Sequence, residues 1–498
     1  MKKYYLIPCL LLSLAISALP LRIHYTNDTH GASLPIEYRE GEQSFSLGGY
    51  SALEYHLNQS RSQHPRSIYL DAGDQQTGTA FAARNINGVT GAAVIEVFNR
   101  LSLDVISFGN HEFDSSNSNT QALMQLSNYP FVNANLIRKD NGDYFGDSPY
   151  TILEREGLRI GVLGLTLVEL PEKVKAENTA NLQILPYKEA IDRHIEKLDC
   201  QTDLIVLLTH LGLPADSLLA TELDNRIDLI IGGHSHDWLP EPLQVNGIYI
   251  CSAGSRLAFL GSLDLEVEND RIASLNNNLI RLTPPPESYS SPLTDYVNTI
   301  EAEIRAELDQ VIAIIPQDWI PDKFQETVLS RWMAEALKQE YAESQAPDIA
   351  ILNNGGFRKI IRAGEVTVRD MHEMLPFENY VGFFTCTGAD LITFLELNGT
   401  HMMTRPYDIC QTSAPGWIDH ICKDWHLHMH EPEYNLGAEI LQADKIYKVV
   451  SHDYVIGQWQ KYLGFEPQNA SITNELIVDA MLRQIKHQYP APTAENPR

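Results

Sequence analysis

Five short apolar runs in the first half of the chain each end in side chains of the kinds that bind metal ions. Such runs, bounded by glycine turns, are typical of buried strands. Gly-flanked histidines and aspartates at the carboxyl ends of strands are the usual place for the active site of an α/β sheet. Helical patterns alternate with the runs, so we expect residues 21–281 to form an α/β domain with a site at its strand ends. The runs cover residues 21–25, 67–70, 105–108, 204–208 and 227–231.

The polar residues after these runs offer carboxylate, amide and imidazole groups but no thiolate. That set suits Zn, Mn, Fe or Ni rather than a structural zinc site built from cysteines. Seven groups exceed the needs of one tetrahedral or five-coordinate ion, whereas two ions sharing a bridging carboxylate, about 3.5–4 Å apart, would use them all. A single Asp-x-His is more often a hydrogen-bonded turn, so the prediction depends on the five motifs together. The candidates are Asp28, His30, Asp74, Asn110, His210, His234 and His236.

Residues 109–114 (Gly-Asn-His-Glu-Phe-Asp) present an imidazole and two carboxylates where a strand gives way to a loop. A proton-transfer pair can be drawn from this set. Gly-Asn and Phe-Asp also occur in ordinary turns, so the stretch taken alone fits both a site and a turn.

The chain of 498 residues is 44% hydrophobic and 20% charged, which is a globular composition long enough for two or more domains. Its formal net charge of -28 argues against binding nucleic acid or an anionic membrane through a basic surface. An acidic enzyme still takes an anionic substrate where bound cations reverse the local field.

Residues 1–18 have the pattern of a signal peptide, with a positive start, a short apolar core and small residues at Ser17 and Ala18. The apolar run is short for a membrane span, so we expect an exported protein, periplasmic or secreted, without a stable membrane anchor. An oxidising compartment permits disulfides, and five cysteines would remain after cleavage. Cys410 and Cys422 are the pair to test first, because they are close together in a loop-rich region; the others are Cys200, Cys251 and Cys386.

A proline-rich stretch begins near residue 282, where the first domain is expected to end. Residues 291–310 have apolar side chains at helical spacing and predict an amphipathic helix, so residues 282–310 form a linker and helix. A second, smaller α/β unit is expected over residues 311–489, and residues 490–498 resemble a frayed tail.

Several motifs resemble the 5′-nucleotidase branch of the calcineurin-like metallophosphatases. In the first domain they are residues 26–31, 109–114, 209–210 and 232–236. Past the linker, residues 326–327 with 333–336, residues 353–358 (Asn-Asn-Gly-Gly-Phe-Arg) and residues 376–379 (Pro-Phe-Glu-Asn) are similar to the C-terminal nucleotidase domain. The resemblance implies an N-terminal four-layer α/β/β/α sandwich, a linker helix that acts as a hinge, and a C-terminal substrate-binding domain.

Carried over by position, the resemblance assigns the ligands to two divalent ions. Asp28, His30, Asp74 and His236 would hold one ion, while Asp74, Asn110, His210 and His234 would hold the other, with Asp74 as the bridge. Asp71 is the alternative bridge, and its other interpretation is a cap for the turn.

His111 and Asp114 match the catalytic dyad of the family. Two cations bring a water to the pKa needed for hydroxide at neutral pH, and that hydroxide attacks phosphorus in line. A histidine oriented by an aspartate then provides the proton or positive charge that the leaving alkoxide needs. The alternative is that His111 is only an outer hydrogen-bonding residue.

Substrate recognition is expected in the second domain. The guanidinium of Arg358 suits a phosphate, and Arg362 four residues on either joins it or forms a surface pair. Asn354 belongs to the same motif. The family stacks a nucleobase between two aromatic side chains; Tyr454 is one candidate, and Trp417 stands near the segment where the other is expected.

The resulting hypothesis is a phosphoric ester hydrolase with two divalent ions (Zn, Mn or similar) that acts on a small nucleotide, most simply a 5′-nucleotidase. The segments that resemble the base pocket, residues 409–413 and 461–465, depart from the family pattern. Two relatives of this reaction therefore stay open: hydrolysis of UDP-sugars or 2′,3′-cyclic nucleotides, and release of sulfate from a protein-bound thiosulfonate. A non-catalytic surface binding protein is the alternative from another class. The sequence leaves the native metal and the oligomeric state undetermined.

Overall fold

The computed structural model describes residues 19–40, 43–404, 409–413, 416–419, 433–436 and 439–491. The predicted signal peptide, Cys422 and residues 492–498 lie outside these ranges. The disulfide between Cys410 and Cys422 and the cleavage site therefore stay predictions.

Two six-stranded sheets form the N-terminal domain, and in each the central strands run parallel. The strand of residues 204–210 is buried along its whole length, as expected for a parallel strand covered on both faces. The first sheet has the order β18 (Ile272–Arg281), β17 (Phe259–Val267), β1 (Leu19–Thr26), β4 (Ser67–Asp71), β7 (Val105–Ser107) and β8 (Phe131–Val132). The second has the order β10 (Tyr150–Arg155), β11 (Leu158–Thr166), β13 (Leu204–His210), β14 (Leu229–Gly232), β16 (Ile248–Cys251) and β15 (Leu243–Val245).

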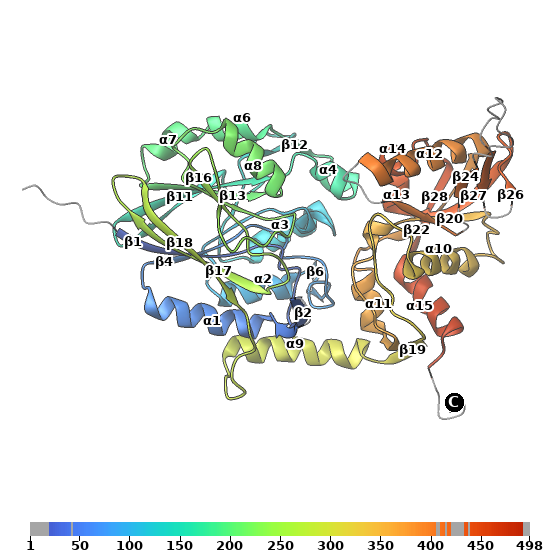
Figure 1. Cartoon of the computed structure of the whole chain (residues 1–498), viewed down its shortest axis with the longest axis horizontal. Coiled ribbons are helices and arrows are strands. Elements are labelled where there is room, and N and C mark those ends of the chain that lie inside the picture. Colours follow the sequence, from blue (N-terminus) through green and yellow to red (C-terminus); the bar gives the residue numbers. More distant parts are fainter. Residues whose placement is uncertain are drawn as a thin grey trace, which may run out of the picture.

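The two sheets pack face to face, because one apolar core contains side chains from both, such as Ile23 and Val206. Helices cover the outer faces and complete four layers, α/β/β/α (Figure 1). Against the first sheet lie α1 (Tyr50–Gln63), α2 (Ala92–Arg100) and α9 (Pro292–Leu308), and against the second lie α6 (Tyr187–Asp192), α7 (Ile195–Asp199) and α8 (Leu213–Glu222). The predicted sandwich is confirmed.

The C-terminal domain is built on a mixed five-stranded sheet with helices on both faces. The strands have the order β23 (Cys410–Thr412), β20 (Ile349–Asn353), β27 (Ile446–His452), β22 (Tyr380–Thr387) and β28 (Gln468–Leu476). The core on one face includes side chains of α10 (Val328–Glu340), α11 (Val368–Met374) and α15 (Ile477–Gln488), and on the other those of α12 (Gly388–Thr404), α13 (Asp453–Gly457) and α14 (Trp459–Tyr462).

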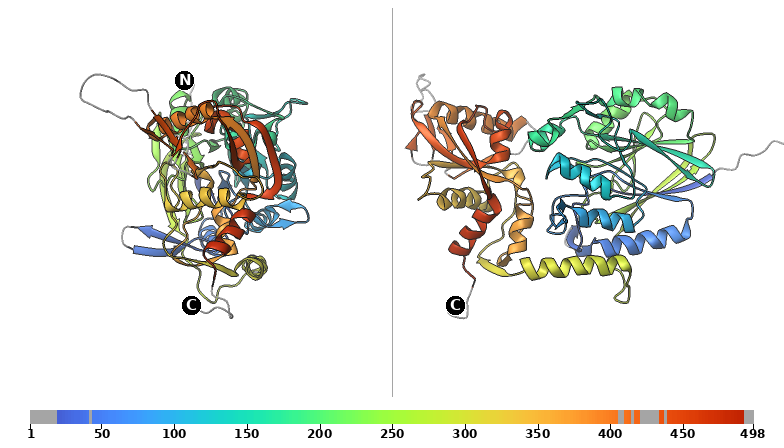
Figure 2. Two further views of the ribbon diagram at one scale, coloured as in Figure 1. Left: turned by 90° about the vertical axis from the view of Figure 1, so that its right-hand side faces the viewer. Right: turned by 180° about the vertical axis from the view of Figure 1, so that it is seen from behind.

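α9 runs along the N-terminal domain and leads directly into the C-terminal one, as the ribbon views show (Figures 1 and 2). Ser291 caps its first turn by accepting a hydrogen bond from the backbone N–H of Thr294, and Pro292 occupies the first helical position. The helix lies within the predicted residues 291–310. On the opposite side, the short helix α4 (Leu170–Lys173) of the first domain reaches α13 and α14 of the second.

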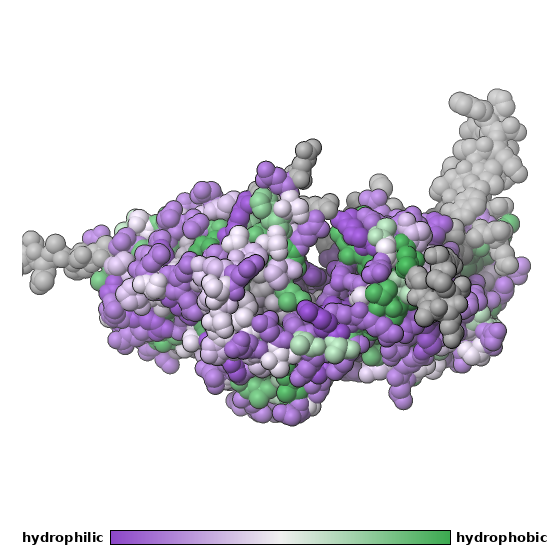
Figure 3. All heavy atoms as spheres, turned by 90° about the horizontal axis from the view of Figure 1, so that it is seen from below, coloured by the Kyte–Doolittle hydropathy of each residue, from purple (hydrophilic) through white to green (hydrophobic). Residues whose placement is uncertain are grey.

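The surface on the face shown in Figure 3 is mainly hydrophilic, and it is hollowed where the two domains meet. Within the described ranges, every helix falls short of the length and apolar character that a membrane crossing requires. The domains thus enclose a shared space while each keeps its own core.

Candidate active site

The strand ends of the two sheets bring all seven predicted ligands to the same edge of the sandwich. Ligand atoms of Asp28, His30 and His236 lie within 4.8 Å of one another, and so do those of Asp74, His210 and His234. Asn110, which follows β7, lines the same cavity as Asp74 and His234. Asp74 also groups with His30 and His111, which places its carboxylate between the two sets.

The backbone is strained where these ligands are presented. Left-handed backbone is rare for residues other than glycine and costs about 1–2 kcal/mol for each residue. Such residues concentrate at functional sites, where the surrounding structure holds them in place. The ligand candidates with positive φ are Asp28 (49°), His30 (50°), Asp74 (57°), His234 (80°) and His236 (59°).

The donor atoms fit divalent cations. His210 donates from Nδ1 to the carbonyl of Ala72 (2.7 Å), so its Nε2 faces Asp74 Oδ2 at 3.0 Å. His30 Nε2 and His236 Nε2 face each other at 3.1 Å, and Asn110 Oδ1 is buried without a hydrogen-bond partner. Opposed acceptor atoms at these distances need a proton or a metal ion between them. The oxygen and imidazole set therefore matches the divalent metal binding that the sequence predicts.

Electrostatics in the metal-ligand cluster point the same way. Burial alone would lower the pKa of His210, but the adjacent carboxylates of Asp74 and Asp28 outweigh it and raise that pKa to about 10. Burial, with His210 as a further positive neighbour, lowers the pKa of His234 to about 3. Without a metal ion, His210 thus holds a positive charge between the carboxylates, at the place where a bound cation would be favoured, while His234 stays neutral, as a metal-bound imidazole must be.

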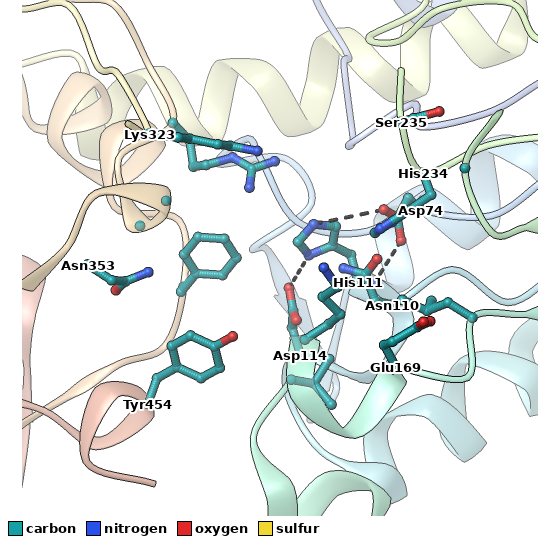
Figure 4. Close-up of a pocket in the computed structure, with 18 of the residues that line it drawn as sticks. Asp74, Asn110, His111, Asp114, Glu169, His234, Ser235, Lys323, Asn353 and Tyr454 are labelled. Atoms are coloured by element: carbon teal, nitrogen blue, oxygen red, sulfur yellow. Dashed lines mark hydrogen bonds and ion pairs between the residues drawn. The ribbon is translucent and has the colours of Figure 1, made fainter. Parts of the chain in front are cut away.

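His111 and Asp114 form a short hydrogen bond, with His111 Nδ1 2.6 Å from Asp114 Oδ2 (Figure 4). A single turn of 3-10 helix, His111–Phe113, brings the two together. The other ring nitrogen, Nε2, lies 3.8 Å from Asp74 Oδ2. Burial lowers the pKa of His111, but Asp114 and Asp74 together raise it by a larger amount, so the net shift is upward. The two carboxylates therefore favour the protonated form of the ring, which adjoins the ligand cluster.

Glu112, to which the sequence assigned no role, holds two of the ligand loops together. Its buried carboxylate accepts hydrogen bonds from the backbone N–H groups of Asp74 (3.0 Å), Gln75 (2.8 Å), Gln76 (3.4 Å) and Gly109 (2.7 Å). Burial and the charge of Asp74 raise the pKa of Glu112 to about 7, while the N–H groups act in the opposite direction. In the sequence, the only sign of this role was that Glu112 is an acidic residue within the 109–114 motif.

Asp71, the alternative bridging residue, points elsewhere. Its carboxylate accepts hydrogen bonds from Thr26 Oγ1 (2.5 Å) and from the backbone N–H of Gly73 (3.0 Å). It belongs to none of the ligand clusters among the described residues. Its contacts are those of a residue that caps a turn.

A cavity of about 650 Å³ lies between the ligand cluster and the C-terminal domain. His111, Asp114, Asp74, Asn110 and His234 form one wall, and Figure 4 shows Lys323, Asn353 and Tyr454 on the facing wall. Although the chain is acidic overall, the lining includes several cationic side chains: Lys173, Lys175, Lys323, Arg358 and Lys461. The cavity therefore combines metal ligands with positive charge, which suits an anionic ester.

The predicted substrate residues are divided by the structure. Arg358 and Tyr454 line the cavity. Arg362 lies away from it and pairs with Asp318 Oδ2 at 2.6 Å, which is the surface pair left open above. Asn354 is fully buried and donates to the carbonyls of residues 322 and 325, whereas its neighbours Asn353 and Gly355 line the cavity. Trp417 belongs to β24 (Gly416–Asp419), and its side chain is outside the described part of the structure.

Phe377 is the main lining residue that the sequence analysis left without a role. Its ring stacks on His111 with centroids 5.8 Å apart and 25° between the planes, and the guanidinium carbon of Arg358 lies 5.6 Å from its centroid. Tyr462 and Lys461, in the segment that departs from the family pattern, also line the cavity. The 376–379 motif contained the signal for Phe377, but only domain packing shows that it meets His111.

Two family models match the chain: calcineurin-like phosphoesterase over residues 21–238 and the 5′-nucleotidase C-terminal domain over residues 311–466. A 5′-nucleotidase from Vibrio cholerae is 25% identical over 447 residues, which cover 78% of this chain and 76% of that protein. An apyrase from Tabanus yao is 26% identical over 442 residues, covering 78% and 74%.

The fold is shared with the crystal structure of a 5′-nucleotidase precursor from Thermus thermophilus. The TM-score is 0.81 at 20% sequence identity, with 95% of this chain and 97% of that chain covered. The two family models together span most of both domains, and the His and Asp clusters are candidate ligands for the divalent metal that a metallophosphatase fold implies. The chain therefore belongs to the calcineurin-like phosphoesterases that carry a 5′-nucleotidase C-terminal domain, and it is a metal-dependent phosphoric ester hydrolase.

Proposed function

We propose that this protein is an exported 5′-nucleotidase that uses two divalent ions to release phosphate from nucleoside 5′-monophosphates. The observation that carries the proposal is the His111–Asp114 pair, which adjoins the ligand clusters and opens into a cavity walled on the far side by the nucleotidase domain. A phosphate placed against the ligands would have its ester oxygen near His111 and its nucleoside toward the C-terminal wall.

The chain's own residues have distinct roles in this proposal. His111 donates its Nε2 proton to the departing 5′-oxygen, and Asp114 fixes the ring by accepting from Nδ1. Arg358 binds phosphoryl oxygens, and Phe377 covers the His111 ring and limits its exposure to water. Two ions, when bound, would supply the charge that polarises the phosphoryl group and lowers the pKa of water toward neutrality.

The seven ligand candidates divide between the two ions as the clusters do. Asp28, His30 and His236 would hold one ion, and His210, His234 and Asn110 the other, with Asp74 shared. Metal analysis of the purified protein should find close to two ions per chain. One ion or none would contradict this part of the proposal.

The substrate is tested by a panel of AMP, UDP-glucose, 2′,3′-cyclic AMP and a peptide that carries a thiosulfonate. We expect kcat/KM to be highest for AMP, with inorganic phosphate as a product. Highest activity on UDP-glucose or the cyclic nucleotide would replace the nucleotidase proposal by another phosphohydrolase. If none of the three nucleotides is hydrolysed, the proposed function is wrong, and sulfate released from the peptide would identify the thiosulfonate reaction. Asp114→Asn should depress hydrolysis of whichever ester is cleaved.

Export is supported by the composition of residues 1–18. Expression of the full chain in a bacterium with a periplasm, followed by N-terminal sequencing, should give a mature protein that starts shortly after Ala18. An intact Met1 on protein recovered from the cytoplasm would contradict export.

A further inference from the structure

The loop that follows Asp74 contains a residue that contacts both halves of the site. Thr77 is β-branched and adopts left-handed backbone, with φ of 59°. For a β-branched residue this conformation is an outlier that the surroundings must stabilise. Its carbonyl oxygen lies 3.0 Å from His30 Nδ1, and its hydroxyl donates to Asp114 Oδ2 at 2.8 Å. The strained backbone thus directs the carbonyl to one group and the side chain to the other.

The contact with His30 determines which ring nitrogen is available to a metal ion. Because Nδ1–H donates to the Thr77 carbonyl, Nε2 is left with its lone pair directed at the group formed with Asp28 and His236. The adjacent glycine keeps this approach close, since a Cβ at Gly78 would lie 2.9 Å from His30 Cβ. The loop therefore has little freedom to move relative to His30.

The contact with Asp114 determines the direction of the dyad carboxylate. Oδ2 of Asp114 accepts from both His111 Nδ1 (2.6 Å) and Thr77 Oγ1 (2.8 Å), so two donors fix one oxygen. A carboxylate with a single donor can rotate about its terminal bond, because such sp³–sp² torsions are broad. The threonine hydroxyl removes that freedom.

We propose that Thr77 is a positioning residue that holds the His111–Asp114 pair in register with the metal-ligand cluster. This inference rests on the proposed function, in which His111 delivers a proton to the leaving group. Loss of the hydroxyl should let the dyad turn away while the carbonyl still orients His30. The effect is then confined to protonation of the leaving group.

A small cavity of about 50 Å³ adjoins Thr77 and is also lined by His111 and Asp114. A space of that size admits water. Alanine or glycine in place of Thr77 would enlarge it, and a water could then replace the missing hydroxyl. Thr77→Val is the better variant, because it keeps the volume and the β-branch and removes only the donor. Thr77→Ser restores the donor without the methyl group.

Thr79 provides a matched control on the same loop. It is also partly buried, and its hydroxyl donates to the carbonyl of Gly31 (2.7 Å) and accepts from the backbone N–H of Ala82 (3.2 Å), with no bond to the dyad. Thr79→Val therefore removes hydrogen bonds from the same loop without touching the dyad and tests for a general loss of loop order.

The first measurement is turnover of two esters that differ in leaving group, phenyl phosphate and 2,4-dinitrophenyl phosphate. The dinitrophenolate departs without a proton, so it bypasses the dyad. We expect Thr77→Val to lower kcat for phenyl phosphate about tenfold to hundredfold, as for other residues that orient catalytic groups. Its kcat for the dinitrophenyl ester, its KM values and its metal content should stay close to those of the wild type. Thr77→Ser should recover turnover of phenyl phosphate, and Thr79→Val should affect both esters equally.

The second measurement needs no turnover. In metal-free protein the His111 Nδ1 proton should give a strongly deshielded NMR signal, identified by its absence in His111→Gln. We expect this signal to shift in Thr77→Val, to return in Thr77→Ser and to stay in place in Thr79→Val.

Equal losses for both esters in Thr77→Val, no loss at all, or an unmoved proton signal would each overturn the role of Thr77. A wild-type protein that hydrolyses neither ester, nor any nucleotide of the panel above, would instead overturn the proposed function. The NMR comparison would then decide alone whether Thr77 orients the dyad.

Discussion

One ion pair and two hydrogen bonds link the two domains on the side of the cavity opposite α9. Lys175 Nζ lies 2.9 Å from Asp453 Oδ2 across the domain boundary, and both side chains are largely buried. On the same side, the Tyr454 hydroxyl donates to the carbonyl of Glu172 (3.0 Å), and Gln458 donates to the carbonyl of Pro171 (2.8 Å). If the domains open about α9, as the family resemblance implies, these contacts must break. Removing the ion pair should therefore favour the open arrangement.

The size of the effect follows from the environment of the pair. Fully exposed ion pairs contribute about 0.2–1 kcal/mol, and pairs with restricted solvent contact contribute more. With side-chain exposures of 18% and 16%, Lys175 and Asp453 belong near or above the upper end of the exposed range. We take about 1 kcal/mol for the pair, which corresponds to about a fivefold change in an equilibrium constant. The hydrogen bonds of Tyr454 and Gln458, at about 0.5–1.5 kcal/mol each, remain and still link the two domains.

A double-mutant cycle isolates this interaction from other effects of each side chain. Lys175→Met and Asp453→Asn should each raise KM for the preferred substrate about fivefold and shift the solution scattering of the substrate-bound protein toward a more open shape. Lys175 Nζ also donates to the carbonyl of Glu378, so Lys175→Met loses one contact more than Asp453→Asn. The double variant should resemble Lys175→Met, because the ion pair itself is lost only once. Exchange of the charges, Lys175→Asp with Asp453→Lys, should recover part of the loss. Additive effects, with a coupling energy near zero, would show that the pair does not hold the domains together.

Three other variants test the site and its surroundings. His111→Ala should lower kcat by about 10²–10⁴-fold and leave the metal content intact; loss of metal would make His111 a ligand instead. Glu112→Ala removes the acceptor of four backbone N–H groups and should lower both metal content and the urea midpoint. Burial raises the pKa of Asp216 from 3.8 to about 7. Between these pH values the folded state binds more protons than the unfolded state, so the free energy of unfolding falls as the pH rises through this window. Three pKa units correspond to about 4 kcal/mol as an upper bound. Asp216→Asn should therefore be more stable than the wild type in urea at pH 8 and show no such advantage at pH 4. The same difference in stability at both pH values would contradict this.

The wall of the cavity that carries the candidate metal ligands could be predicted from the sequence, because each of its motifs is short and continuous in the chain. An apolar run specifies a buried strand, and the polar residues directly after it are presented at the strand end. Only the convergence of the five ends required the fold, and two parallel-stranded sheets packed face to face supply it. His111 and Asp114 are three residues apart in one motif, so their contact also needed no long-range information.

The facing wall of the cavity, which the C-terminal domain forms, could not be predicted in the same way, because its contacts join segments that are distant in the chain. Phe377 meets His111 across 266 positions of the chain, and only the packing of the two domains decides that contact. Asn353 and Asn354 are neighbours in one motif, yet Asn353 lines the cavity and Asn354 donates to the carbonyls of residues 322 and 325. Arg362 forms the surface pair that the sequence left as one of two alternatives, but its partner Asp318 is too far along the chain for the local pattern to identify. Residue type was visible in the sequence, but side-chain direction was not.

The strained ligand backbone shows how the fold positions the ligands independently of the metal. Five left-handed residues at about 1 kcal/mol or more each amount to a large share of a typical stability of about 5–15 kcal/mol. They persist because the loops bond to one another: Asp28 N–H donates to Gly73 O (2.9 Å), His30 N–H to Asp74 O (3.0 Å) and Arg256 N–H to Asp28 O (2.8 Å). These bonds join the loops after β1, β4 and β16 through the backbone, and each is made between protein atoms alone. The candidate ligands are therefore held in place by bonds of the protein itself, whereas the facing wall of the cavity depends on how the C-terminal domain packs against them.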